Sequence, residues 1–170
     1  TNFLHGLPHW AVSIALEHKG QIVAGVVFDP AKDEMFFAEK GAGAWMNESR
    51  LRVSGRSRMI EAIFATGLPF GGRADLPDTL SDLGRILPVC AGVRRWGAAA
   101  LDLAYVAAGR YDGFWERRLS AWDLAAGMLI VREAGGMVEP LNPAGNILED
   151  GEIVCANEAL FSGFSKITRG

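Results

Sequence analysis

The stretch that decides the fold is "SAWDLAAGMLIVREAGG", residues 120–136. Residues 124–131 are apolar on all sides, which predicts a buried helix, and the glycine pair 135–136 is suited to end it. One acid, Asp123, stands at its start. Ser120 lies three residues earlier, so this carboxylate is suited to cap the helix. A carboxylate where strand ends and helix starts meet is also suited to bind a hard cation, and the residues alone leave both interpretations open.

The beginning of the chain has the alternating pattern of antiparallel strands. Apolar side chains recur at every second position or in short runs, and pairs of turn-forming residues separate them. We therefore expect a three-stranded meander. Its elements are strands at 10–16, 22–28 and about 35–39, turns at Lys19-Gly20 and Asp29-Pro30, and a loop containing Gly41 and Gly43.

Beyond about residue 55 the pattern changes to alternating strands and helices, which predicts layered α/β structure. We expect two parts: the remainder of an N-terminal α+β part over residues 1–55 and a C-terminal α/β part over residues 56–170. The expected strands lie within 62–70, 92–97, 111–119, 137–141 and 152–157, and the expected helices lie within 76–90, 98–110 and 120–136 and from about Glu158 to the end.

Composition excludes several classes of function. The 170 residues are 49% hydrophobic and carry a net charge of −3, so they present no basic surface for nucleic acid. No apolar run reaches the roughly 18 residues needed to cross a bilayer. Two cysteines, Cys90 and Cys155, have neither metal-site spacing nor a disulfide framework, which favours a reducing cytoplasm and leaves a single disulfide as the alternative.

Two rival chemistries find little support. The histidines His5, His9 and His18 have no accompanying cysteine or acid pattern, so a zinc site is not expected. The glycine-rich phrases "GLPFGG" (67–72) and "KGAGAW" (40–45) lack the G-x-x-x-x-G-K-[ST] pattern that cradles nucleotide phosphates, so we interpret both as turns.

Four phrases together resemble the inositol monophosphatase family, and specifically its bacterial inositol-1-phosphatase branch. The phrase at 122–136 follows the family's W-D-x-A-A-G-x-x-I-V-x-E-A-G-G element almost residue for residue. The likeness covers essentially the whole chain, and the phrases occur in the family's order. They are "TNFLHGLP" (1–8), "KGAGAWMNESRLRVS" (40–54), "RRWGAAALDLAYVAAG" (94–109) and "WDLAAGMLIVREAGG" (122–136).

The resemblance implies a magnesium-dependent phosphomonoesterase in which carboxylates hold Mg²⁺ and an activated water attacks phosphorus in line. Asp123 matches a metal-ligand aspartate of the family and is thus the expected catalytic and metal residue. Glu116 matches the acid that accepts hydrogen bonds from inositol hydroxyls; without the resemblance it would be a solvated glutamate. Gly97, Ala98 and Ala99 match the backbone that lines the sugar pocket, and a simple helix start is their alternative interpretation.

The resemblance further implies an α/β/α/β/α layered sandwich of the sugar-phosphatase type, here truncated at the N-terminus. Family members carry an upstream Glu and the motif D-P-[IL]-D-G-T just before "TNF", where this chain begins, and Thr1 is expected to be the second threonine of that junction. Those upstream residues supply further metal ligands. We therefore expect this chain alone to be inactive, and to self-associate through the strands at 10–16 and 22–28 if covering helices are missing.

The expected substrate of the full-length parent is myo-inositol 1-phosphate or a similar small sugar monophosphate. Fructose 1,6-bisphosphate, phosphoadenosine nucleotides and histidinol phosphate are the alternatives within related families, and a non-catalytic binding or interaction module is the alternative outside them. Glu116, and the lack of an obvious basic cluster, favour a monophosphate. Arg94 and Arg95 either orient an anionic ligand or lie at the surface or a subunit contact. A cytoplasmic, lithium-sensitive homodimer without membrane or nucleic-acid partners is expected.

Overall fold

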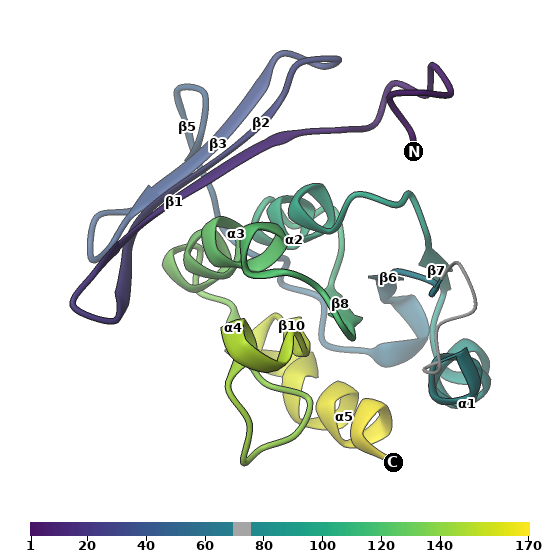
Figure 1. The fold of residues 1–170 in the computed structure, drawn as a ribbon. Helices are drawn as coiled ribbons and strands as arrows, with labels where there is room; N and C mark the ends of the chain where they lie inside the picture. Colours follow the sequence, from purple (N-terminus) through teal and green to yellow (C-terminus); the bar gives the residue numbers. More distant parts are fainter. Residues whose placement is uncertain (70–75) are drawn as a thin grey trace.

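The structure, a computed structural model, describes residues 1–69 and 76–170. Within these residues two five-stranded sheets and their helices stack in layers (Figure 1). The interpretation of "GLPFGG" as a turn lies partly outside the described residues, since it includes residues 70–72.

The first sheet is an antiparallel meander in which each strand pairs with the next along the chain. The three strands expected from alternation are present. The sheet then continues through two short strands. Gly43, which was expected to lie in a loop, begins the first of them. It pairs with Glu39, and its N–H donates to the carboxylate of Glu133 at 2.9 Å. The strands are β1 (Val12–His18), β2 (Gln21–Asp29), β3 (Glu34–Glu39), β4 (Gly43–Met46) and β5 (Ser49–Arg50).

The second sheet is mixed, with the strand order β7-β6-β8-β10-β9. Strand β6 runs parallel to both of its neighbours, β7 and β8, whereas β10 pairs antiparallel with β8 and β9. All five strands fall within the ranges that the sequence predicted. They are β6 (Ile63–Thr66), β7 (Gly92–Arg94), β8 (Gly113–Glu116), β9 (Met137–Glu139) and β10 (Ile153–Ala156).

Helices form a middle layer and an outer layer. Helices α2 (Ala99–Ala107) and α3 (Ala121–Glu133) lie between the sheets, and α1 (Leu76–Ile86) and α5 (Glu158–Arg169) lie against the far face of the second sheet (Figure 1). The short helix α4 (Ile147–Asp150), which the sequence pattern did not predict, packs on α3. The layered α/β sandwich is thus confirmed, and the described residues build four of its layers.

The middle helices approach their neighbours closely at two glycines. A Cβ placed on Gly25 of β2 would lie 2.8 Å from the Cα of Ala126, a backbone atom of α3. A Cβ on Gly127 would lie 2.6 Å from the Cβ of Leu103 on α2. Because real Cβ atoms do not come so close, glycine at these positions sets how tightly α3 packs against the sheet and against α2.

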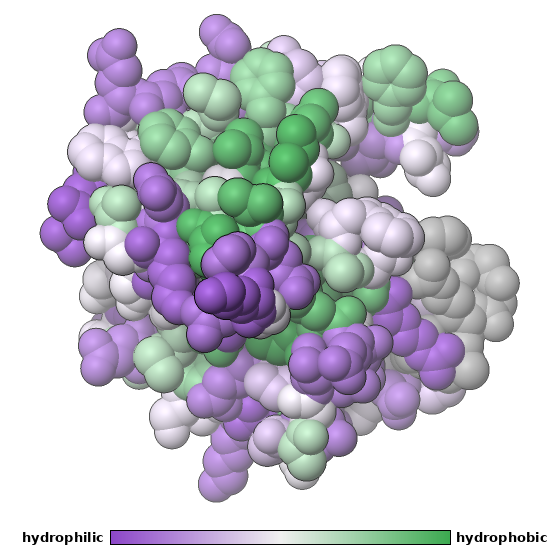
Figure 2. Space-filling view, turned by 60° about the vertical axis from the view of Figure 1, so that its left-hand side comes forward, coloured by the Kyte–Doolittle hydropathy of each residue, from purple (hydrophilic) through white to green (hydrophobic). Residues whose placement is uncertain are grey.

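The outer face of the first sheet is apolar and exposed. Val12, Ile14 and Leu16 alternate along β1, and the Ile14 side chain is 63% exposed. Hydrophobic side chains are visible across the upper part of the molecule, where this sheet lies (Figure 2). An exposed apolar face of this kind is a candidate interaction surface, so self-association remains a prediction.

Two further findings concern composition. The thiols of Cys90 and Cys155 are both free and buried. Burial also raises the pKa of the Cys155 thiol to about 12. Among the described helices, none combines the length and the apolar character that crossing a bilayer would require.

Candidate functional site

A cavity of about 440 Å³ opens where the parallel strands β6 and β8 end and the helices α2 and α3 begin. We call it the strand-end cavity. Its walls combine polar and apolar groups, and the chain's N-terminal loop lies along one side. Its lining residues are Thr1, Asn2, Gly67, Leu68, Arg95, Gly97, Ala98, Ala99, Glu116, Arg118, Leu119, Ser120 and Asp123.

The structure brings together all the site residues expected from the family resemblance. Gly97, Ala98 and Ala99 form one wall, and Glu116 and Asp123 approach from β8 and α3. Gly97 has a φ of 79°, a backbone conformation that favours glycine. No described side chain caps α2 at Ala98, and Ala98 and Ala99 line the cavity, so the first N–H groups of this helix are available as hydrogen-bond donors for an anion or a hydroxyl.

Asp123 caps its helix and also lines the cavity. The backbone N–H of Ser120 donates to Asp123 Oδ2 at 3.0 Å, as the Ser-x-x-Asp pattern predicts. This bond occupies one carboxylate oxygen and leaves Oδ1 outside it. The capping interpretation and the ligand interpretation are therefore compatible, because each requires a different oxygen of the half-buried side chain.

Glu116 lies directly over Gly67, a contact that sequence reasoning missed. A Cβ on Gly67 would come within 1.8 Å of Glu116 Oε1, so only glycine leaves room for the carboxylate in this position. Gly67 follows β6 and Glu116 ends β8, and these strands are adjacent and parallel. Neighbouring parallel strands end at the same edge of the sheet, which explains why residues distant in sequence meet here.

Asn2 holds the N-terminal loop against the cavity. Its Nδ2 donates to the carbonyl oxygens of His9 and Trp96, each at 2.8 Å. Trp96 directly precedes Gly97, so these bonds connect the loop to the start of α2. The sequence offers no local signal for this contact, because its partners are 94 positions apart.

The two arginines of "RRW" have different positions. Arg95 lines the strand-end cavity, whereas Arg94 is exposed and does not line it. Arg118 also lines the cavity, with a positive φ of 58°. Sequence reasoning expected no obvious basic cluster, and the fold nevertheless places two guanidinium groups at this cavity with Glu116 and Asp123.

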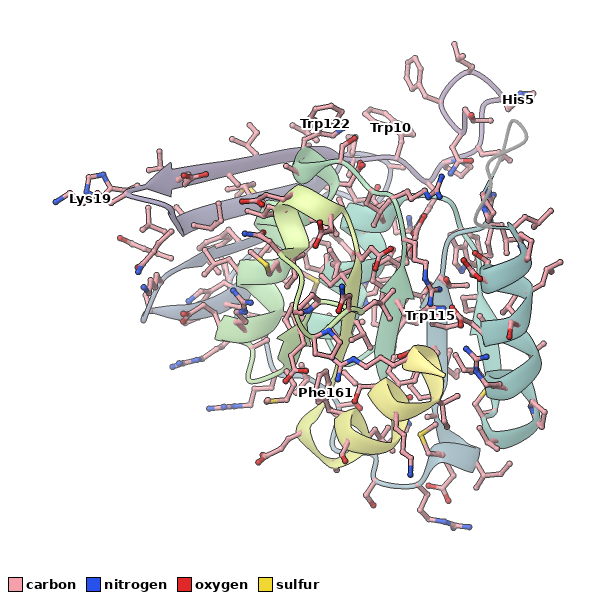
Figure 3. All side chains as sticks on the ribbon, turned by 60° about the horizontal axis from the view of Figure 1, so that its bottom comes forward. His5, Trp10, Lys19, Trp115, Trp122 and Phe161 are labelled. Carbon is pink, nitrogen blue, oxygen red and sulfur yellow. The ribbon has the colours of Figure 1, made fainter. Side chains whose placement is uncertain are left out.

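A neighbouring cavity of about 300 Å³ shares the wall formed by Gly97, Ala98, Ala99 and Asp123. Trp10 and Trp122 border it and lie near one another at the start of β1 (Figure 3). Sequence reasoning did not single out either tryptophan as a site residue. Their broad apolar rings lie at the same cavity as the polar side chains of Asn2 and Asp123, and such a mixture is typical of small-molecule sites.

The three histidines lie in separate environments. His9 is buried between the rings of Trp96 and Tyr105, and its Nε2 has no hydrogen-bond partner among the described residues. Burial, with a smaller effect from Lys32, lowers the pKa of His9 below its ordinary value, and Asp29 acts in the opposite direction. His5 lies far from Lys19, the neighbour of His18 (Figure 3).

The described residues do not complete a magnesium site. Across residues 1–69 and 76–170, no three His, Cys, Asp or Glu side chains are grouped so that they would hold a metal ion. Mg²⁺ requires near-octahedral oxygen coordination, and Asp123 Oδ1 would supply one such oxygen if this residue is the metal ligand that the sequence predicts. The described residues therefore fit only part of a magnesium site, because they offer fewer oxygen ligands than the ion requires.

Asp102 is a buried acid beneath the strand-end cavity. It lies in the first turn of α2, its side chain is 1% exposed, and its Oδ1 has no hydrogen-bond partner among the described residues. Burial, and secondarily the negative charge of Glu116, raise the pKa of Asp102 well above its ordinary value of 3.8, while Arg95 acts in the opposite direction.

The Asp102 carboxyl should make stability depend on pH. Its pKa is raised in the folded state, so it stabilises the fold below pH 3.8 and this contribution is lost as pH rises toward the folded pKa. Between pH 3.8 and the pKa of Asp102 in the folded state, the free energy of unfolding of the wild type should fall, relative to that of Asp102→Asn, by up to about 1.4 kcal/mol per pH unit. Urea unfolding at a series of pH values measures the difference, and parallel pH curves would contradict the raised pKa. The control is Asp33→Asn, which changes an exposed aspartate.

Comparison with known proteins identifies the relatives of this chain. The model of the inositol monophosphatase family matches residues 1–169. The inositol-1-monophosphatase of Rhizobium meliloti is 52% identical over 167 residues, which are 98% of this chain and 63% of that protein. The Nus factor SuhB of Pseudomonas aeruginosa is 50% identical over 163 residues, which are 95% of this chain and 60% of that protein. The crystal structure of extragenic suppressor protein suhB from Bartonella henselae is similar with a TM-score of 0.94 and 48% identity, covering 99% of this chain and 65% of that one.

Fold and cavity define the class: a layered α/β protein with a polar site at the ends of parallel strands and the starts of two helices. The chain belongs to the inositol monophosphatase family. It spans less than two thirds of the length of the relatives described above.

Proposed function

We propose that the full-length protein hydrolyses myo-inositol 1-phosphate, or a similar small sugar monophosphate, to the free alcohol and phosphate. The observation that carries this proposal is the meeting of Glu116, Asp123 and the Gly97-Ala98-Ala99 wall around one cavity. Membership of the inositol monophosphatase family supports a phosphatase. The size of the cavity, about 440 Å³, is within the range of small-molecule sites.

Each group at the cavity has a role that follows from its chemistry. The ionised carboxylate of Glu116 accepts hydrogen bonds from hydroxyl groups of the substrate. The N–H groups at the start of α2 donate to substrate oxygens, and Arg95 adds positive charge nearby. Asp123 Oδ1 contributes one ligand to Mg²⁺, which supplies charge neutralisation at the phosphoryl oxygens when bound. The proposal requires further carboxylates from outside the described residues.

The first experiment compares the 170-residue chain with the full-length encoded protein. Phosphate release from inositol 1-phosphate is measured with and without Mg²⁺, and intact mass identifies which polypeptide is present. The proposal expects Mg²⁺-dependent release by the full-length protein and none by the 170-residue chain. A full-length protein that releases no phosphate from inositol 1-phosphate or related sugar monophosphates would exclude the proposed activity.

Glu116→Gln should weaken the discrimination among phosphate esters. Glutamine keeps the size of the side chain but loses the charge that strengthens hydrogen bonds from hydroxyls. We expect the ratio of kcat/KM for inositol 1-phosphate to that for p-nitrophenyl phosphate, which has no ring hydroxyls, to fall by about tenfold. Gly67→Ala should lower the same ratio by displacing Glu116. An unchanged ratio in Glu116→Gln would refute the role of this residue.

The substrate panel should extend beyond inositol 1-phosphate. Arg95 and Arg118 both line the strand-end cavity, and guanidinium groups bind phosphate well. Fructose 1,6-bisphosphate, a phosphoadenosine nucleotide and histidinol phosphate therefore belong in the panel. We propose that the monophosphate gives the highest kcat/KM, and that the enzyme is a lithium-sensitive cytoplasmic homodimer without membrane or nucleic-acid partners.

A non-catalytic binding or interaction module is the second candidate. The incomplete set of metal-binding side chains within residues 1–69 and 76–170 favours it. Some relatives also carry the name Nus factor rather than the name of an enzyme. Further acidic metal ligands in the encoded protein would count against this candidate, and their absence there would favour it.

A further inference from the structure

Asp82 is a buried carboxylate on α1 that the proposed chemistry does not use. Its side chain is 1% exposed, and its two oxygens have different partners. Oδ1 accepts from the guanidinium of Arg85 at 2.5 Å. Oδ2 accepts from the indole N–H of Trp115 at 3.2 Å and also from the guanidinium of Arg117. Figure 3 shows Trp115 between the second sheet and α1.

The two partners of Asp82 Oδ2 are the residues on either side of Glu116. Trp115 lies in β8, where successive side chains point to opposite faces, and Arg117 directly follows the strand. Both bind Asp82 on α1, whereas Glu116 between them lines the strand-end cavity. One carboxylate oxygen therefore holds both neighbours of the acid that is proposed to bind substrate hydroxyls. Rotation or displacement of this strand end would break at least one of these bonds.

The same carboxylate is itself held firmly. Arg85, which binds Asp82, also donates from Nε to the carbonyl oxygen of Ile167 at 2.9 Å. Arg117 donates from Nη2 to the carbonyl oxygen of Thr168 at 3.3 Å. Asp82 thus connects α1, the end of β8 and the end of α5. A buried charge with several directed partners fixes geometry well, because each lost bond leaves a buried group unpaired.

We infer that Asp82 is a positioning residue for Glu116: by binding Trp115 and Arg117 it sets where the Glu116 carboxylate lies over Gly67 and therefore how the cavity distinguishes substrates. This inference rests on the proposed function, which assigns Glu116 to substrate hydroxyls. Asp82 acts from outside the cavity and touches no substrate, since it does not line the cavity.

The test is Asp82→Asn in the full-length protein. Asparagine keeps the volume and one acceptor oxygen but loses the charge that holds Arg117. We expect KM for inositol 1-phosphate to rise by about fivefold to tenfold. Discrimination against p-nitrophenyl phosphate should fall in the same proportion, with kcat for that ester changed less than about twofold. Arg117→Gln leaves the bond between Asp82 and Trp115 in place and should change KM in the same direction. This variant tests the inference if Asp82→Asn does not fold.

Asp112→Asn is the matched control. Asp112 is also 1% exposed and ion-paired, to Arg56 at 3.1 Å, but it directly precedes β8, at the end of the strand opposite to Glu116. A merely structural role predicts that both variants lower the melting temperature and leave substrate discrimination unchanged, and that result would overturn the inference. Positioning predicts that Asp82→Asn alone changes discrimination.

Glu116→Gln measured in parallel separates this inference from the proposed function. If Glu116→Gln changes discrimination and neither Asp82→Asn nor Arg117→Gln does, only the positioning role fails. If Glu116→Gln itself changes nothing, the proposed role of Glu116 fails and the positioning role fails with it. Equal changes in Asp82→Asn and Glu116→Gln, with no change in Asp112→Asn, support both.

Discussion

Asp123→Asn in the full-length protein is expected to lower kcat by at least about a hundredfold, or about 2.7 kcal/mol of transition-state stabilisation. Asparagine retains an oxygen that accepts the Ser120 N–H, so the helix cap survives and stability should fall by less than about 1 kcal/mol. The charge that Mg²⁺ requires is lost. Steady-state phosphate release and thermal unfolding measure the two effects separately.

The control for Asp123→Asn is Asp78→Asn. Asp78 lies in the first turn of α1 and is exposed, so the substitution makes the same chemical change at another helix start and away from the cavity. We expect its kcat to equal that of the wild type. If Asp123→Asn also kept full activity, Asp123 would be a helix cap and not a metal ligand.

Gly25→Ala is expected to lower the free energy of unfolding by about 2 kcal/mol. The added Cβ would lie 2.8 Å from Ala126 Cα and 3.0 Å from its carbonyl oxygen. Both are backbone atoms of α3, so neither moves aside by a change of rotamer. The strand or the helix must shift, and the contacts of the shared core are lost. Chemical denaturation of the two proteins gives the difference.

Gly84→Ala provides the comparison for Gly25→Ala. Gly84 lies within α1 and has no atom within 4 Å of its Cβ position. Alanine there should stabilise the protein by up to about 1 kcal/mol through helix propensity alone. If Gly25→Ala were as stable as the wild type, the close approach of β2 and α3 would not be a constraint on the fold.

The longer elements were predictable from the sequence because each is long enough to show an alternating pattern or a sustained apolar run. The alternation at 10–16 predicted β1, and the apolar runs at 22–28 and 124–131 predicted β2 and α3. The short strand β4 and the helix α4 were missed. Helix α4 has local signals, with Asn146 as its cap and Gly151 at a φ of 70°, but its four residues are too few to show a period.

The residues of the candidate site likewise divide into those that the sequence predicted and those that it did not. Asp123 and Glu116 were predictable because they lie in phrases that resemble those of a known family. Gly67 and Asn2 were not, since their roles depend on contacts with residues 49 and 94 positions away. Asp82 has no signal at all in the sequence, because an acid on an amphipathic helix is ordinarily solvated. Contacts between segments that are distant in the sequence can be identified only from the folded structure.

The position of α3 between the sheets has a consequence for the order of folding. The last described strand of the first sheet ends at Arg50, yet the helix that covers the inner face of this sheet begins only at Ala121. During synthesis on the ribosome, the strands therefore emerge well before the surface against which they pack. Until that helix is made, the inner face of the meander is exposed to water and to other nascent chains, the circumstance in which partly folded chains aggregate or recruit chaperones.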